Sequence, residues 1–149
     1  IRPNVFTKYA EHSNIVSNMM QYSMFDTRPE EYMDILSNNT VSIIARGVLA
    51  QGMLIDKQAK EYLGHTMEVV SELKNAVDQL ANRYSVTNES IPLQYVLQHS
   101  AVASALVGIR TESQVLALLK AYQDTSDIPA DNINKCIIKR IKYHEHRTS

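Results

Sequence analysis

The stretch Val102–Gln114, VASALVGIRTESQ, decides the fold of this chain. Its first six residues form an apolar run of strand length, and such continuous apolarity is typical of a strand buried on both faces. Gly108 closes the run, and Thr111 has the side chain of an N-cap for a helix that extends to Tyr122. The stretch therefore predicts a strand that leads directly into a helix, the repeating unit of parallel α/β folds.

Two earlier runs have the same character. Ile15–Gln21 is apolar and bounded by polar residues, and Val41–Ala45 is a β-branched run closed by Gly47. Thr66–Tyr84 is the clearest helix, because its apolar residues recur along one stripe. Other helical patterns begin at Pro3 and Pro29, cover Ile91–Leu97 and Thr111–Tyr122, and end with a stripe of Ile133, Ile137, Ile138 and Ile141. Strands that alternate with helices predict right-handed βαβ units and a parallel sheet of about three strands.

Size and charge narrow the protein class. The 149 residues are 44% hydrophobic and 21% charged with a net charge of -1, an ordinary globular composition. A complete (β/α)8 barrel typically needs about 250 residues, so this chain is too short for one. The near-neutral charge gives no reason to expect nucleic acid as a partner, and Lys139, Arg140 and Lys142 are interpreted as a solvated helix face.

Cysteine, histidine and hydropathy patterns add three expectations. Cys136 is the only cysteine, which excludes an intramolecular disulfide and favours a reducing compartment. No apolar run approaches the roughly 18 residues of a membrane span, so we expect no membrane partner, and a cytoplasmic location is the default expectation. His144 and His146 are too few ligands for a metal site, and none is expected.

The segments that follow the last two strand runs could bind an anion. Gly47 and Gly52 allow sharp turns or a close approach of the backbone to a ligand. Gly108 and Thr111 stand at a helix N-terminus, where free N–H groups favour phosphate, and Arg110 adds a guanidinium fork. Taken alone, a strand–glycine–helix junction is more often a simple turn.

Taken together, these segments resemble the aldo-keto reductase superfamily. IIARGVLAQGML at 43–54 resembles the family's seventh strand and loop, I-A-x-x-P-L-A-x-G-L-L, and LVGIRTESQ at 106–114 resembles its eighth, V-x-G-x-R-x-x-x-Q. Met20–Ser23 with Arg28–Glu31 resembles the sixth strand and loop, and Leu93–Ser104 resembles the helix and loop before the last strand. The resemblance covers essentially the whole chain.

The resemblance implies an α/β fold that is the C-terminal half of a (β/α)8 TIM barrel. Residues 1–149 would begin at the helix after the fifth strand, with the N-terminal half absent. The family's catalytic Asp, Tyr, Lys and His come from the second to fourth strands, so no catalytic residue is assigned in this chain. The parent protein would be an NADP-dependent oxidoreductase that reduces a small aldehyde or ketone, and the chain alone is expected to be inactive.

The resemblance also implies which residues contact NADP. In the loop after the seventh strand, Leu49, Ala50 and Gly52 would lie over the pyrophosphate, and Arg46 stands where an aromatic residue usually stacks on the nicotinamide. Met19 replaces a glutamine that contacts the nicotinamide amide in many members.

The segment after the eighth strand would hold the adenosine end of the cofactor. Gly108, Arg110 and Gln114 match it, Arg110 would suit the 2′-phosphate, and Thr111 could add a hydroxyl. Ala117 and Leu118 stand where many members have Glu and Asn against the adenine, and neither can make those hydrogen bonds.

A different class of function stays open. Three strands leave sheet edges that would expose unpaired backbone groups and apolar surface. The chain could therefore be a non-catalytic half-barrel that self-associates or pairs with its missing half. A third alternative is a complete reductase from which only this portion was retained, for instance after proteolysis.

Overall fold

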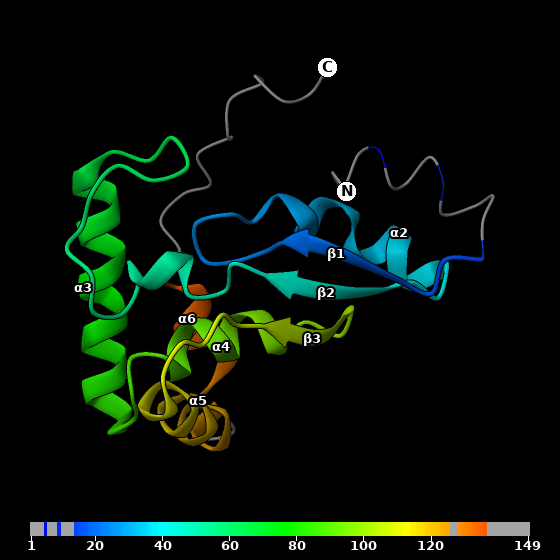
Figure 1. Cartoon of the computed structure of the whole chain (residues 1–149). Helices are drawn as coiled ribbons and strands as arrows, with labels where there is room; N and C mark the ends of the chain where they lie inside the picture. Colours follow the sequence, from blue (N-terminus) through cyan, green and yellow to red (C-terminus); the bar gives the residue numbers. More distant parts are fainter. Residues whose placement is uncertain (1–4, 6–8, 10–13, 126–127, 137–149) are drawn as a thin grey trace.

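The computed structural model describes Val5, Tyr9 and residues 14–125 and 128–136. Its centre is a parallel sheet of three strands in the order β1-β2-β3, formed by β1 (Ser17–Gln21), β2 (Ser42–Arg46) and β3 (Val102–Leu106). Gln21 is in register with Arg46, and Arg46 with Leu106, so the carboxyl ends of the strands are level with one another. Figure 1 shows all three arrows running toward helix α3. The predicted α/β fold with about three parallel strands is confirmed.

The helices lie between the strands in the predicted order. The 3-10 helix η1 (Arg28–Tyr32) leads into α2 (Met33–Asn38) before β2, and η2 (Ala50–Gly52) follows β2. The others are α3 (Met67–Tyr84), α4 (Ser90–Leu97), α5 (Glu112–Asp124) and α6 (Ala130–Asn134). Pro29 does open a helical segment, but its first turns are 3-10 rather than α.

Helix α3 shows how the sequence pattern becomes structure. Thr66 precedes it with extended backbone and Ser85 ends it in the left-handed conformation, which limits the helix to the predicted range. The buried residues recur at helical spacing as Val70, Leu73, Val77, Leu80 and Ala81. Helix α4 contacts β3, α3, α5 and α6, so it is the central helix of the packed layer.

The described residues cover only one face of the sheet, which differs from the expectation that the strands are buried on both faces. Along β1, Asn18 and Met20 are buried while Ser17 and Met19 are exposed, and β2 buries Ile43 and Ala45. Met19 keeps 44% of its surface and Leu106 on β3 keeps 52%. A continuous apolar run signals two contact faces, but the described residues supply a layer for only one of them.

A buried polar network joins the segments around the first strand. The Tyr22 hydroxyl donates to Glu30 Oε1 at 3.2 Å, and the Tyr95 hydroxyl donates to the same oxygen. The two rings also pack with their centroids 5.4 Å apart. Burial, together with the neighbouring Tyr22 and Glu30, raises the pKa of Tyr95. The network fixes the loop after β1 and helix η1 against α4.

Several sequence predictions fall beyond the described residues. They are most of the helix after Pro3, the end of the last helix with Ile137, Ile138 and Ile141, the basic cluster 139–142, and His144 with His146. In the described part of the chain, no helix combines the length and the apolarity that crossing a lipid bilayer requires. Within the same residues, no group of three or more His, Cys, Asp or Glu converges as metal ligands would.

Candidate functional site

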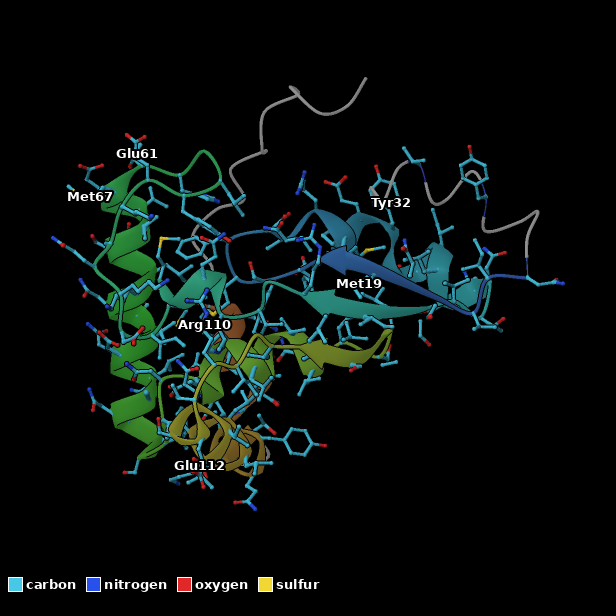
Figure 2. All side chains as sticks on the ribbon, viewed as in Figure 1. Met19, Tyr32, Glu61, Met67, Arg110 and Glu112 are labelled. Atoms are coloured by element: carbon cyan, nitrogen blue, oxygen red, sulfur yellow. The ribbon has the colours of Figure 1, made fainter. Side chains whose placement is uncertain are left out.

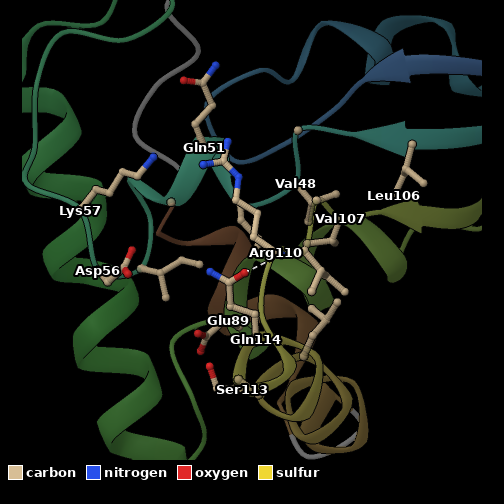
Figure 3. Close-up of a pocket in the computed structure, with 18 residues that line it drawn as sticks. Val48, Gln51, Asp56, Lys57, Glu89, Leu106, Val107, Arg110, Ser113 and Gln114 are labelled. Atoms are coloured by element: carbon tan, nitrogen blue, oxygen red, sulfur yellow. Dashed lines mark hydrogen bonds between the residues drawn. The ribbon is translucent and has the colours of Figure 1, made fainter.

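A pocket of about 810 Å³ opens at the carboxyl ends of β2 and β3 (Figure 3). Its walls come from the loop after β2, the loop after β3, the first turns of α5, and Glu89 at the start of α4. Parallel strands deliver their following loops to the same edge of the sheet, which is where α/β proteins bind ligands. The sequence predicted this edge as the binding region, and the structure places a pocket there.

The loop after β2 has an unusual backbone. Gly47 and Gly52 have φ values of +73° and +92°, and the non-glycine residues Ala50 and Gln51 also have positive φ values, +49° and +59°. Left-handed backbone costs of order 1 kcal/mol or more for each non-glycine residue and persists only where the surroundings impose it. Here Ala50 is completely buried, and the Ala50 N–H donates to the Gly47 carbonyl at 2.9 Å.

Gly52 is the pivot of this loop. Its carbonyl accepts the N–H groups of Ile55, Asp56 and Lys57 at 3.1, 3.2 and 3.1 Å. A Cβ at Gly52 would come within 3.2 Å of Asp56 Oδ1 and 3.3 Å of Lys57 Cε. The chain therefore turns tightly around this carbonyl, and it brings Asp56 and Lys57 to the wall of the pocket.

The loop after β3 is held by polar side chains instead. Thr111 caps α5, because its Oγ1 accepts the Gln114 N–H at 3.3 Å. Gln114 reaches back, and its Oε1 accepts the Arg110 N–H at 2.8 Å. This pair resembles a capping box, displaced by one residue toward the strand. These two hydrogen bonds engage the N–H groups of Arg110 and Gln114. Among the described residues, the N–H groups of Glu112 and Ser113 at the start of the helix stay free for a ligand.

The pocket brings together five of the eight residues predicted to bind cofactor: Leu49, Gly52, Gly108, Arg110 and Gln114. The other three do not line it. Ala50 lies in the core, Thr111 is turned toward its capping role, and Arg46 donates to Gln21 Oε1 at 3.4 Å across the strand ends. Figure 2 shows Arg110 near these loops and far from Met19, which lies on β1.

Comparison with known proteins identifies the group to which this architecture belongs. The sequence model of the Aldo/keto reductase family matches residues 4–138, most of the chain. The chain belongs to the aldo/keto reductase family. The family that the sequence was predicted to resemble is thereby confirmed.

Three proteins illustrate this aldo/keto reductase relationship. The uncharacterized oxidoreductase YqkF of Bacillus subtilis is 40% identical over an alignment of 130 residues, which covers 81% of this chain and 42% of that protein. The aldo-keto reductase AKR11C1 of Bacillus halodurans, in its apo form, has a TM-score of 0.79 at 32% identity, over 99% of this chain and 52% of that one. Glycerol dehydrogenase AKR11B4 of Gluconobacter oxydans, at 15% identity with a TM-score of 0.70 over 95% of this chain and 49% of that one, shows the shared fold.

The chain spans about half the length of these relatives, since it covers 42% of YqkF and 52% of AKR11C1. The solved chains align with nearly all of its residues, so the three-stranded sheet is one part of their larger fold.

Three charged residues of the pocket were not predicted from the sequence: Asp56, Lys57 and Glu89. Lys57 extends from one wall toward Arg110 on the other, while Glu89 lies beside Ser113 and Gln114 in Figure 3. No spacing signal marks them, because their positions depend on the turn around Gly52 and on the start of α4.

A second cluster lies where the loop after β2 meets the loop after β1. His65 donates from Nε2 to the Phe25 carbonyl at 2.8 Å, and the Phe25 ring packs against the rings of Tyr62 and His65 with centroids 5.6 and 5.4 Å apart. Burial raises the pKa of Tyr62, Asp26 raises it further, and Arg46 lowers it. Tyr62 and His65 had no predicted contact, and the structure shows that they join the two loops.

Proposed function

We propose that this chain forms the cofactor-binding part of an NADP-dependent aldo-keto reductase, whose substrate is a small aldehyde or ketone. The observation that carries the proposal is the pocket between the two predicted loops, with Arg110 in its wall. A bound nicotinamide dinucleotide would supply the hydride. In this proposal the three strands are the last three of an eight-stranded barrel, and residues 1–149 form its C-terminal half.

The residues present suit a dinucleotide phosphate. The volume of about 810 Å³ lies within the range of ligand and cofactor sites. Apart from its two neighbours, no described residue has an atom within 4 Å of a Cβ built on Gly108, so a ligand has room to approach that backbone. Arg110 provides a guanidinium that can bind phosphate through two hydrogen bonds, and Lys57 adds a second cation. Ala117 and Leu118 offer apolar surface that could pack against an adenine ring.

Each predicted residue has a defined task in this proposal. Leu49 and Gly52 would cover the pyrophosphate, and Gly108 and Arg110 would hold the adenosine end. Gln114 would act mainly by fixing the Arg110 backbone, since its side-chain oxygen is already engaged there. Ala50 and Thr111 would shape the loops, and Arg46 would stand beside the nicotinamide.

Binding of NADPH and NADH to the purified chain tests the 2′-phosphate assignment. Arg110→Met should weaken NADPH binding by roughly tenfold or more and NADH binding much less, since charge-assisted hydrogen bonds contribute about 1.5–3 kcal/mol. Arg83→Met, on the last turn of α3, is the matched control and should change neither. Equal losses for both cofactors would contradict the assignment to the 2′-phosphate.

The chain alone should not turn over a carbonyl compound, because no residue of it matches the family's catalytic Asp, Tyr, Lys or His. Oxidation of NADPH by pure chain above a buffer blank would contradict this expectation. A cytoplasmic location also stays a prediction.

A second function rests on exposed apolar surface. Leu116, Leu119 and Tyr122 on α5 keep 62%, 57% and 63% of their surface, and Leu106 keeps 52% at the neighbouring strand. Such a surface is typical of a protein interface. We propose as the alternative that the chain self-associates or pairs with its complementary half through this surface. Light scattering that finds a compact monomer at high concentration would count against self-association.

A further inference from the structure

The segment Gly52–Lys57 is anchored at two points. At one end, the Gly52 carbonyl accepts hydrogen bonds from three backbone N–H groups, as described above. At the other end, Lys74 of helix α3 donates from Nζ to the Lys57 carbonyl at 2.7 Å. Residues 58–61, which follow Lys57, have no regular secondary structure. The hydrogen bond from Lys74 is therefore the contact that ties the far end of the segment to a rigid element.

The anchored end carries side chains of the pocket. Asp56 and Lys57 are themselves exposed, yet both line the pocket wall opposite α5. In Figure 3 the Lys57 side chain extends toward Gln51 and Arg110. Because the Gly52 carbonyl already accepts the N–H groups of Asp56 and Lys57 at 3.2 and 3.1 Å, the backbone of the segment can shift only outward, away from the Gly52 turn. The hydrogen bond from Lys74 of α3 to the Lys57 carbonyl opposes that outward shift.

We propose that Lys74 is a positioning residue for the cofactor pocket. It holds the Lys57 backbone so that Lys57 stays across the pocket from Arg110, and it thereby sets the affinity and the release rate of the phosphate-bearing ligand. Lys74 does not line the pocket, so it acts through Lys57. The inference rests on the proposed function, for which NADPH is the probe.

The first arm of the experiment does not need a cofactor. Trypsin cleaves after lysine, and the carbonyl that Lys74 holds belongs to the Lys57–Gln58 peptide bond itself. Limited proteolysis followed by mass spectrometry measures cleavage at this bond. Lys74→Met keeps the aliphatic stem but loses the donor, so cleavage should accelerate roughly fivefold, as expected when a segment held by one charge-assisted hydrogen bond is released.

The second arm measures NADPH affinity by the change in NADPH fluorescence. Lys74→Met should raise the Kd roughly three- to tenfold, the loss expected for one solvent-exposed hydrogen bond of ordinary net strength, while Lys74→Arg should keep most of the affinity. Lys57→Met should also weaken binding. In that background Lys74→Met should have little further effect, because two residues that act as one unit are not additive. Lys120→Met, which removes an exposed ion pair with Asp124 on α5, is the control and should behave like the unmodified chain.

Three results would overturn the inference. An unchanged cleavage rate after Lys57 would show that Lys74 does not hold the segment, whether or not cofactor binds. Faster cleavage with unchanged NADPH affinity, or additive losses in the double variant, would show that the tie has no role in the pocket. A failure of the unmodified chain to bind NADPH counts against the proposed function instead, and it is recognised because it affects every variant alike.

Discussion

The loops after β2 and β3 line one pocket but are held by different forces. The loop after β2 buries Val48, Ala50, Met53 and Leu54 almost completely in the core. The loop after β3 is exposed at every residue from Gly108 to Gln114, and its conformation depends on two hydrogen bonds made by Thr111 and Gln114. The first loop is therefore an extension of the core, and the second is a surface turn fixed by a helix cap.

Because the two loops are held by different forces, substitutions in them should affect different properties of the chain, its stability in one case and its ligand binding in the other. Burying a Leu or Met side chain contributes about 1.5–3 kcal/mol, while a hydrogen bond contributes about 0.5–1.5 kcal/mol net. Substitutions in the loop after β2 should mainly unfold the chain, and those in the loop after β3 should mainly change what the pocket binds. Pairs of matched variants, one in each loop, test this division.

The largest difference in the free energy of unfolding is expected between alanine variants of the apolar residues Leu54 and Ile109. Leu54 is completely buried and Ile109 keeps 42% of its surface. Leu54→Ala should lower the free energy of unfolding by about 3 kcal/mol, because it leaves a cavity in the core. Ile109→Ala should lower it by less than about 1 kcal/mol. Urea denaturation followed by circular dichroism measures both, and similar losses for the two variants would break the distinction between the loops.

The stability losses of Gly52→Ala and Gly108→Ala should differ by a smaller amount. Gly52→Ala places a Cβ at a φ of +92° and against Asp56 and Lys57, so it should cost about 2 kcal/mol of stability. Gly108 has open space at its Cβ position, and Gly108→Ala should change stability by less than about 0.5 kcal/mol. The same Cβ would project into the pocket, so NADPH affinity should fall although the fold is intact. Thermal unfolding and NADPH titration of both variants check the pair, and a destabilised Gly108→Ala would contradict the open space seen there.

Much of the fold could be predicted from local pattern. The apolar stripe of Thr66–Tyr84 and the strand runs beginning near Ile15, Val41 and Val102 gave elements whose bounds agree to within about two residues. These segments are long or strongly periodic, so their conformation depends little on distant contacts. The open face of the sheet could not be predicted, because an apolar strand residue carries the same signal whether or not its covering layer belongs to the chain.

The pocket was only partly predictable. Leu49, Gly52, Gly108, Arg110 and Gln114 line it, because loops that follow neighbouring parallel strands must meet at one edge. Asp56, Lys57 and Glu89 were missed, since they reach the pocket through tertiary packing that leaves no motif. Ala50 and Thr111, which the resemblance assigns to the ligand, do not line the pocket: Ala50 is buried in the core, and Thr111 makes the predicted N-cap of α5.

The smallest predicted effect concerns the cap of α5. Thr111→Ala removes the acceptor of the Gln114 N–H and should lower the free energy of unfolding by about 1 kcal/mol. Thr111→Ser keeps the hydroxyl and should restore most of that loss. Because Gln114 also holds the Arg110 backbone at 2.8 Å, loosening the cap should let Arg110 move, and NADPH should bind more weakly than the stability loss alone explains. Chemical denaturation and NADPH titration, done side by side on both variants, separate the two effects. If Thr111→Ala lowers stability but leaves NADPH affinity unchanged, the cap supports the helix only, and Arg110 is placed by the strand end rather than by the turn that follows it.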